Sequence, residues 1–313
     1  MTQARFVHIV DDVPELDGLS DGPVMLVALE GFLDAGSASA LAVGHVQDGR
    51  ASTVVASFEV DEFYDYRARR PPMSFVEDHY SDYDAPRLVV RVVHDDTNTP
   101  FLLLTGPEPD TRWEGFAEAV RQVIEHFEVR LSVSLGSVPM AVPHTRPVQL
   151  TNHATAKRLL ISENVWSGEI RIPSSAQALL ELRLGEWGHD ATGFVAHIPH
   201  YVAQFPYPEA AAAMLRQVAS VTGLAWDTEV LERAASERTA EINAQVADAD
   251  EVRSVVEGLE QQYDAFHRAA SASLLAEGEE LSAADLPTGD ELGAQFEQFL
   301  AGLDDGSEKG QDD

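Results

Sequence analysis

The sequence contains no cysteine and has only two lysines. Without cysteine, the chain can form neither a disulfide nor a thiolate metal site, which is compatible with a reducing cytoplasm, the compartment we predict. It also lacks the run of about 20 apolar residues that a membrane-spanning helix needs, so no membrane association is expected. Residues 1–5 lack the basic and then apolar pattern of a signal peptide.

Positive charge is scarce throughout the chain. The chain has 53 acidic and 21 basic residues, which gives a formal net charge of −32. Its two lysines are Lys157 and Lys309. Such a surface repels phosphate backbones and anionic lipid, so nucleic-acid binding is not expected. Two interpretations of the acidity remain open. It can serve solubility, including in a salt-tolerant or GC-rich host, or it can attract a basic protein partner.

The negative charge is unevenly distributed. Residues 225–313 hold 23 acidic and 5 basic side chains, a net charge of −18. This shift in composition places a boundary near Gly223. We therefore predict an α/β domain over residues 1–223, a helical C-terminal region over 224–303 and a disordered acidic tail over 304–313.

Strands and helices alternate in the first part of the chain. Continuous apolar runs predict strands covered on both faces, at residues 23–29, 53–58, 88–93, 101–104, 131–136 and 193–198. Helical patterns follow at residues 35–45, 111–127, 174–187 and 210–222. The alternation predicts an α/β fold with three layers, in which a mixed, mostly parallel sheet carries helices on both faces.

Several helices carry more detailed signals. Thr111 and Glu114 fit a capping box, and the apolar residues that follow from Trp113 to Phe127 recur at helical spacing. In the 174–187 helix, Ala178, Leu179 and Leu182 are expected to face inward. After Gly223 the pattern predicts two helices, over residues 228–247 and 251–270, with one or two weaker helices over 274–303.

Polar segments follow several of the predicted strands. Because ligands of open α/β sheets favour the carboxyl ends of the strands, these segments form the candidate ligand site. Its residues are Glu30, Asp34, Glu108, His144, Arg146 and His200. His144 and Arg146 lie between two prolines, which stiffen the loop that presents them.

Three of these residues also have a structural interpretation. Asp34 can share acid and base roles with Glu30, or it can cap a helix by accepting from the Gly36 and Ser37 amides. Arg146 can bind an anion or pair with an internal carboxylate such as Glu108. His144 can move a proton or satisfy loop carbonyls.

No established cofactor motif accompanies these residues. The glycine spacing matches neither a dinucleotide nor a phosphate-binding loop. His197 and His200 lie three residues apart at a strand end, which is poor support for a zinc site. Ser132, Ser134 and Ser137 lie near histidines in the sequence, but the Gly-x-Ser-x-Gly motif of a hydrolase is absent. We therefore predict no cofactor, no metal and no catalytic triad.

An aromatic segment provides a candidate subunit interface. Phe63, Tyr64 and Tyr66 are followed closely by Arg70, and tyrosine and arginine are enriched at interface anchors. The alternative is that the segment is buried within one subunit.

Five ordered segments together resemble the proteasome assembly chaperone family, in its prokaryotic, mainly actinobacterial and archaeal, branch. These segments are residues 27–36, 63–71, 106–113, 135–147 and 199–204. The similarity covers roughly residues 20–265. It implies a fold similar to the nucleoside phosphorylase/hydrolase architecture, an added C-terminal helical region and homo-oligomers, often trimers. No catalytic residue can be transferred from the family.

The resemblance leads to two hypotheses about function. The first is a non-enzymatic, oligomeric protein of the assembly-chaperone or protein-interaction type, with proteasome subunits as possible partners. Chaperones that dock on proteasome cylinders can use a C-terminal hydrophobic-Tyr-x motif, whereas this sequence ends with residues 309–313, Lys-Gly-Gln-Asp-Asp, which speaks against docking by that route. The alternative is a protein that binds a nucleoside or an anion, or a hydrolase, with its site at the strand carboxyl ends.

Overall fold

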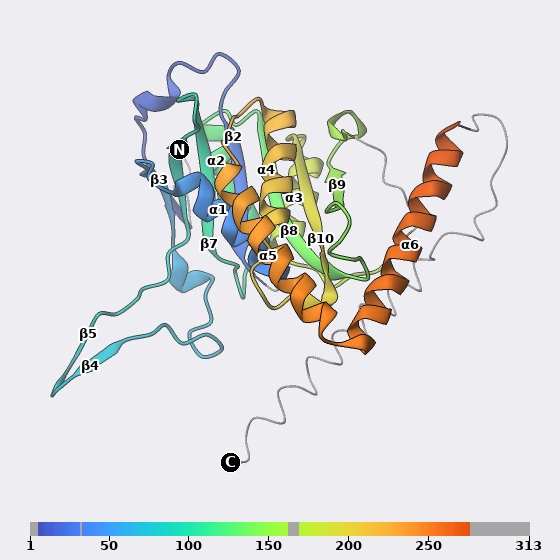
Figure 1. The fold of residues 1–313 in the computed structure, drawn as a ribbon. Helices are drawn as coiled ribbons and strands as arrows, with labels where there is room; N and C mark the ends of the chain where they lie inside the picture. Colours follow the sequence, from blue (N-terminus) through green and yellow to red (C-terminus); the bar gives the residue numbers. More distant parts are fainter. Residues whose placement is uncertain (1–5, 32, 162–168, 276–313) are drawn as a thin grey trace.

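An eight-stranded sheet forms the centre of the protein in this computed structural model, which describes residues 6–31, 33–161 and 169–275 (Figure 1). The strands in chain order are β1 (Val7–Ile9), β2 (Val24–Glu30), β3 (Thr53–Phe58), β6 (Val89–His94), β7 (Pro100–Pro107), β8 (Leu131–Met140), β9 (Leu150–Ala154) and β10 (Ala191–Pro199). Across the sheet they lie in the order β1-β3-β6-β7-β2-β8-β10-β9. A separate hairpin is formed by β4 (Ser74–Val76) and β5 (His79–Ser81).

The centre of the sheet is parallel. Strands β7, β2, β8 and β10 run in the same direction, with Leu26 opposite both Leu103 and Val133. The outer strands β1, β3, β6 and β9 each pair antiparallel with a neighbour. The predicted mixed α/β sheet is therefore confirmed, and its parallel part lies where both faces are covered, as parallel strands require.

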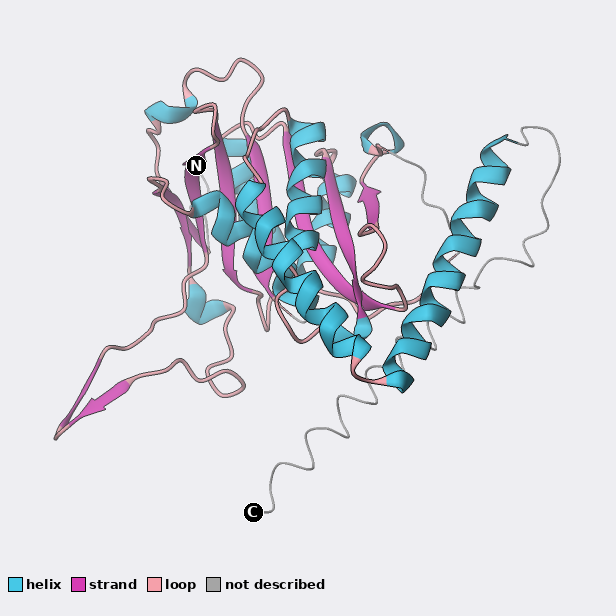
Figure 2. Cartoon of the chain, in the orientation of Figure 1, coloured by secondary structure: helices cyan, strands magenta, loops and turns pink. Residues whose placement is uncertain are grey.

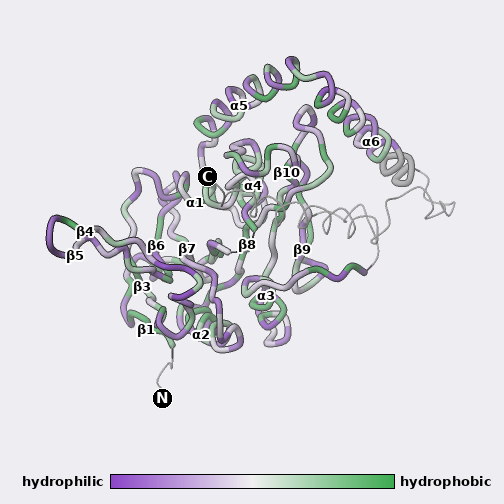
Figure 3. Tube along the Cα trace, turned by 90° about the horizontal axis from the view of Figure 1, so that it is seen from below, coloured by the Kyte–Doolittle hydropathy of each residue, from purple (hydrophilic) through white to green (hydrophobic). Residues whose placement is uncertain are grey.

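Helices cover both faces of the sheet and give three layers (Figures 2 and 3). The helices are α1 (Ala38–Gln47), α2 (Trp113–His126), α3 (Ala176–Trp187), α4 (Pro208–Thr222), α5 (Glu229–Ala247) and α6 (Asp250–Leu275). Helices α1 and α4 share one hydrophobic core with the sheet, and α2 and α3 share the other. Every residue of β2 from Val24 to Ala28 is buried, because this strand lies between the two cores.

Two glycines allow close backbone approaches at the ends of central strands. Gly36, between β2 and α1, has φ 65°, and a Cβ there would lie 2.7 Å from Cβ of Tyr207. Gly106 in β7 has φ 133°, and a Cβ would lie 2.1 Å from the Arg87 carbonyl oxygen. Both conformations are disfavoured for other residues, so both positions need glycine.

Two predicted details of the helices are wrong. Thr111 does not cap α2: the N-cap is Arg112 in a left-handed conformation, and the Thr111 hydroxyl donates instead to the Glu62 carbonyl. In α3 the buried residues are Ala176, Leu180 and Leu184, whereas Leu182 is 57% exposed. The inward face is therefore shifted from the predicted one, and Ala176, Leu180 and Leu184 pack in the core that α3 shares with α2 and the sheet.

The C-terminal helices differ in how they meet the body. Gly223 ends α4 with φ 79°, at the predicted boundary. Helix α5 then packs on α4, and its Leu231 and Ile242 belong to the same core as the sheet. Helix α6 turns away from α5 and runs along the outer side of the molecule (Figure 1). The division into domains stays a prediction, and most of the expected weak helices and the acidic tail lie outside the described residues.

The sequence patterns did not predict the short strands. These are β1, β9 and the β4–β5 hairpin, whose strands have three to five residues each. Runs this short carry little periodicity. Among the described helices, none is long and apolar enough to cross a membrane.

Candidate functional site

The candidate residues share one edge of the sheet. Because β2, β7, β8 and β10 are parallel, their carboxyl ends lie together, and the polar segments that follow them lie along that edge. Glu30 ends β2 and is exposed, and His200 follows β10 and is also exposed. The other four residues form bonds to different neighbours, so the edge divides into separate clusters.

Asp34 caps helix α1. Its Oδ1 accepts from the Ser39 amide at 2.8 Å and its Oδ2 from the Ala40 amide at 3.0 Å. Capping was one of the two interpretations, but the predicted donors, Gly36 and Ser37, are wrong. The Ser137 hydroxyl also lies 2.9 Å from Asp34 Oδ1 and 2.8 Å from the Ala35 carbonyl oxygen, which ties this turn to β8.

Glu108 lies at the start of α3. Its Oε1 accepts from the Ala176 amide at 2.6 Å, where the positive end of the helix dipole favours a carboxylate. The Glu108 amide donates to the Glu30 carbonyl at 2.9 Å. Gly31 is close enough that a Cβ there would lie 2.4 Å from Glu108 Oε2. Glu108 therefore joins the ends of β2 and β7 to α3.

Gln177 bridges a split in the sheet that no sequence pattern predicts. The pairing of β2 with β8 ends at Val27 and Ser134, whereas β2 follows β7 as far as Glu30. In this split, Gln177 Oε1 accepts from the Leu29 amide at 3.3 Å, and Gln177 Nε2 donates to the Leu135 carbonyl at 2.9 Å. The side-chain amide thus replaces ladder bonds between two strands that diverge.

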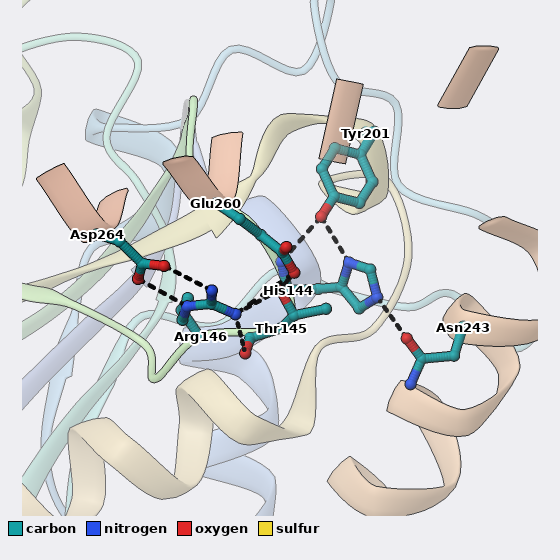
Figure 4. Close-up of polar contacts among 7 residues, drawn as sticks. All are labelled: His144, Thr145, Arg146, Tyr201, Asn243, Glu260 and Asp264. Carbon is teal, nitrogen blue, oxygen red and sulfur yellow. Dashed lines mark hydrogen bonds and ion pairs between the residues drawn. The ribbon is translucent and has the colours of Figure 1, made fainter. Parts of the chain in front are cut away.

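His144 is buried and connects three segments (Figure 4). Its Nε2 lies 3.0 Å from Asn243 Oδ1 of α5, and its Nδ1 lies 2.6 Å from the Tyr201 hydroxyl. Because an amide oxygen only accepts, Nε2 carries the hydrogen and Nδ1 accepts from Tyr201. The same hydroxyl accepts from the His144 amide at 2.8 Å. His144 therefore bonds to Tyr201 and Asn243 rather than to the loop carbonyls of the predicted structural alternative.

Arg146 holds α6 (Figure 4). Its Nε and Nη2 donate to the two carboxylate oxygens of Asp264 at 2.8 and 2.7 Å, and its Nη1 lies 3.4 Å from Glu260 Oε1. The structural alternative predicted that Arg146 pairs with Glu108, but Arg146 pairs with Asp264 instead. Thr145 also donates to Glu260, and the Tyr263 hydroxyl donates to the Pro147 carbonyl at 3.2 Å. The loop of residues 143–147 is thus a clamp for the α5–α6 pair.

The surroundings change the acidity of several of these groups. Burial raises the pKa of the Tyr201 hydroxyl to about 12, so this group stays protonated at neutral pH. The hydrogen bonds from Arg146 hold the pKa of Asp264 below its usual range, which keeps the pair charged. Burial lowers the pKa of His197 to about 4, and this ring bonds to the Thr151 hydroxyl at 2.8 Å.

The candidate interface is only partly at the surface. Phe63 is 1% exposed and packs against Phe6 and Phe116, with ring centroids 5.5 and 6.0 Å apart. Its assignment to an interface is wrong, because the side chain belongs to the core between the sheet and α2. Tyr64 and Tyr66 are partly exposed and Arg70 is exposed, so their role at an interface stays a prediction.

The arrangement favours structural joints over acid-base chemistry at this edge. The carboxylates of Asp34 and Glu108 accept from helix amides, and the cation of Arg146 faces a carboxylate. Among the described residues, no group of three or more histidine, aspartate or glutamate side chains could hold a metal ion. Ligand binding by the six candidate residues stays a prediction.

Comparisons with known proteins place the chain among relatives of the same fold. The model of the PAC2 family matches residues 28–246. The structure of a Mycobacterium tuberculosis protein of unknown function is 46% identical, with a TM-score of 0.78 over 84% of this chain and 92% of that one. A Corynebacterium glutamicum protein of unknown function is 37% identical, with a TM-score of 0.78 over 83% of this chain and 97% of that one.

A third solved structure carries a functional description. It is a proteasome-assembly chaperone homologue from Mycobacterium tuberculosis, 27% identical with a TM-score of 0.66, and it covers 74% of this chain and 99% of that one. A search of the curated proteins finds no match. The family match covers most of the chain and includes four of the five motifs in full. The chain therefore belongs to the PAC2 family, the proteasome assembly chaperone family that its motifs indicate.

Proposed function

We propose that this protein acts by binding other proteins as a homo-oligomer, in an assembly-chaperone-like role, and performs no catalysis at the carboxyl edge of its sheet. Family membership supports this role, as does the description of one relative as a proteasome-assembly chaperone homologue. Proteasome subunits are accordingly the first partners to test.

The observation that carries the proposal is the β4–β5 hairpin. It projects from the body and is tied to it at one end (Figure 1). Large apolar side chains on and beside it are exposed: Met73 51%, Phe75 62%, Val76 45%, Tyr80 74% and Tyr83 48%. Monomeric proteins rarely expose so many neighbouring apolar groups, and an isolated two-stranded hairpin is marginal in water. Contact with another protein would cover these side chains.

Two measurements test the proposal. Light scattering at micromolar concentration should give a mass above that of one chain, and native pull-down with mass spectrometry should recover a defined complex. The double variant Phe75→Ser, Tyr80→Ser should lower the mass measured by light scattering, the amount of complex recovered, or both. The matched control Leu182→Ser changes a side chain that is 57% exposed on α3, and it should leave both unchanged. The proposal would be contradicted if the protein is a monomer, captures no partner, and its removal from the cell disturbs no complex.

The small-molecule alternative has its own measurement. It requires His144 and Arg146 to be available to a ligand, whereas both are bonded to the helical pair. Thermal-shift titrations with nucleosides and with inorganic phosphate should therefore show no stabilisation. A saturable shift that disappears in Arg146→Gln would support ligand binding instead.

A further inference from the structure

Helix α6 carries an apolar stripe that the described part of the chain covers only in part. Val252, Val255, Leu259 and Phe266 recur at helical spacing and form this stripe. Leu259 is 8% exposed, whereas Val252 and Val255, at the start of the stripe, are 39% and 49% exposed. Among the α6 side chains that the structure describes, only Val256 and Leu259 are buried. The start of the stripe is therefore open to contact with another chain.

Acidic side chains surround this open face. Residues 248–260 hold five acidic residues and one arginine, Arg253, which pairs with Asp250 at 3.0 Å. Glu251 is exposed and lies four positions before Val255, so the two lie on the same side of the helix. A partner that fits this face must combine apolar side chains with positive charge.

The β4–β5 hairpin and the segment before it, residues 67–83, which we call the arm, have both properties. Three of its first four residues are arginines, and no other four-residue window of the sequence holds three lysines or arginines. Arg69 pairs with Asp110 at 2.6 Å. Arg67 and Arg70 are exposed and form no ion pair with the described residues. Two cations at the base of the arm are thus available to a partner.

The tip of the arm is an aromatic pair. Phe75 of β4 and Tyr80 of β5 lie opposite each other, with ring centroids 5.1 Å apart. A two-stranded hairpin has no core of its own in which to bury such rings. The arm and α6 lie at opposite sides of the molecule in two perpendicular views (Figures 1 and 3). The arm therefore projects away from the α6 of its own chain, and the two surfaces can meet only between copies.

The net charge distinguishes between two candidate occupants of the α6 face. Each copy carries −32, so contact between copies is repulsive except where cations meet carboxylates. A second α6 would match the apolar stripe, but it would bring the acidic residues of 248–260 from both copies together. The arm matches the stripe with its aromatic tip and brings Arg67 and Arg70 to the same place. Charge complementarity therefore favours the arm.

We propose that the arm of one chain docks on the open start of the α6 stripe in a second copy. Its aromatic tip covers Val252 and Val255, and its unpaired arginines face the acidic residues around them. Because the two surfaces differ and lie at opposite sides of one chain, the contact is head to tail, and such contacts form rings where the rotation between copies closes. This docking mode rests on the homo-oligomer proposed above and names the surfaces that build it.

The absence of cysteine allows a direct test by cross-linking. Tyr80→Cys gives the full chain a single thiol at the tip of the arm, to which benzophenone maleimide attaches. Irradiation should produce a dimer of chains on a denaturing gel, and mass spectrometry of that dimer should place the cross-link in residues 250–268. The reciprocal variant, Val255→Cys, should cross-link to the arm. The same reagent on Leu182→Cys, at a position 57% exposed on α3, should reach neither segment.

Substitutions on the helices supply a second measurement. Val255→Asp places a carboxylate in the docking face, so it should weaken self-association at least about 5-fold, the effect of losing one interface anchor. Val230→Asp is the matched control, because Val230 is a valine of α5 that is 63% exposed, and it should leave the dissociation constant unchanged. Analytical ultracentrifugation measures both constants, and circular dichroism melting curves identify any variant that fails to fold.

The results distinguish the docking mode from the homo-oligomer itself. Light scattering can show an oligomer while the cross-links join α6 to α6, or while Tyr80→Cys reaches only surfaces other than α6. Either pattern overturns docking of the arm on α6 and leaves the homo-oligomer in place. A folded Val255→Asp variant that associates as tightly as the wild type has the same meaning. A monomer at micromolar concentration overturns both proposals.

Discussion

At the scale of single residues, the most distinctive motif of the chain has an architectural role. His144 and Tyr201 come from two of the five motifs and bond to each other, and both contact the C-terminal helices or the loop that holds them. A histidine and an arginine in a stiff loop suggested ligand binding. Their partners are instead other parts of the same chain, so these motif residues stabilise a junction.

Removal of the His144 ring should destabilise the protein. The ring is 3% exposed, and alanine would leave the Tyr201 hydroxyl and the Asn243 amide without their buried partner. The buried cavity and the lost bond of the half-buried Tyr201 hydroxyl cost about 2–4 kcal/mol together, whereas Asn243 is exposed and can bond to water instead. Urea denaturation of His144→Ala should show a loss of this size. His200→Ala, at an exposed position on the same edge, should change the unfolding free energy by less than about 0.5 kcal/mol.

His197 should make stability depend on pH. Burial lowers its pKa to about 4, so the unfolded chain, with an ordinary value near 6.5, binds the proton more readily. The stability from the neutral ring is present above about pH 6.5 and is lost as the pH falls toward 4, by at most about 3 kcal/mol. Urea denaturation at several pH values should show a smaller loss in His197→Gln than in the wild type.

A second variant separates burial from hydrogen bonding as the cause. Thr151→Val removes the hydroxyl that bonds to His197 but keeps the imidazole in place. It should retain the pH dependence of the wild type, since burial is the cause of the lowered pKa. A wild-type stability curve that matches that of His197→Gln between pH 7 and 4 would show that this residue does not titrate as described.

At the scale of elements, local patterns were predictable and distant partnerships were not. The strand at residues 53–58 matches β3 in both bounds, because a continuous apolar run is a local property. Arg146 and Asp264 lie 118 positions apart, and no local pattern around either residue predicts that the two form a pair. The rotation of α3 was missed for the same reason, since the surfaces that bury Leu180 and Leu184 come from other elements.

The clamp predicts a specific effect on α6. Arg146→Gln removes both bonds to Asp264, while the sheet and α1–α4 keep their contacts. An exposed ion pair of this kind contributes about 0.2–1 kcal/mol, so amide exchange in α6 should become about 1.5- to 5-fold faster. Hydrogen exchange with mass spectrometry should place the change in residues 250–268 and leave β2 and β8 unaffected.

Arg183 offers the matched control for that experiment. It also forms a two-bond pair, with Glu114 at 2.9 and 2.6 Å, but it joins α3 to α2 on the other face of the sheet. Arg183→Gln should leave exchange in α6 as in the wild type. Equal exchange in α6 for both variants would mean that the clamp does not hold this helix.

At the scale of the whole molecule, the net charge opposes folding. The chain carries −32 at pH 7, and like charges are brought closer together in the compact state. Salt shortens the range of this repulsion, from about 30 Å at 0.01 M to about 10 Å at 0.1 M. The ion pairs of the surface are screened as well, but with 21 basic residues they can offset only part of the repulsion among 53 acidic ones.

The melting temperature should therefore rise by several degrees between 10 and 300 mM sodium chloride, which corresponds to about 1–2 kcal/mol for a domain of this size. Differential scanning fluorimetry measures the shift. Choline chloride should give the same rise at equal ionic strength, because screening does not depend on the identity of the cation. A rise with sodium alone would indicate a bound ion instead, and a fall with both salts would mean that attractive pairs outweigh the excess of negative charge.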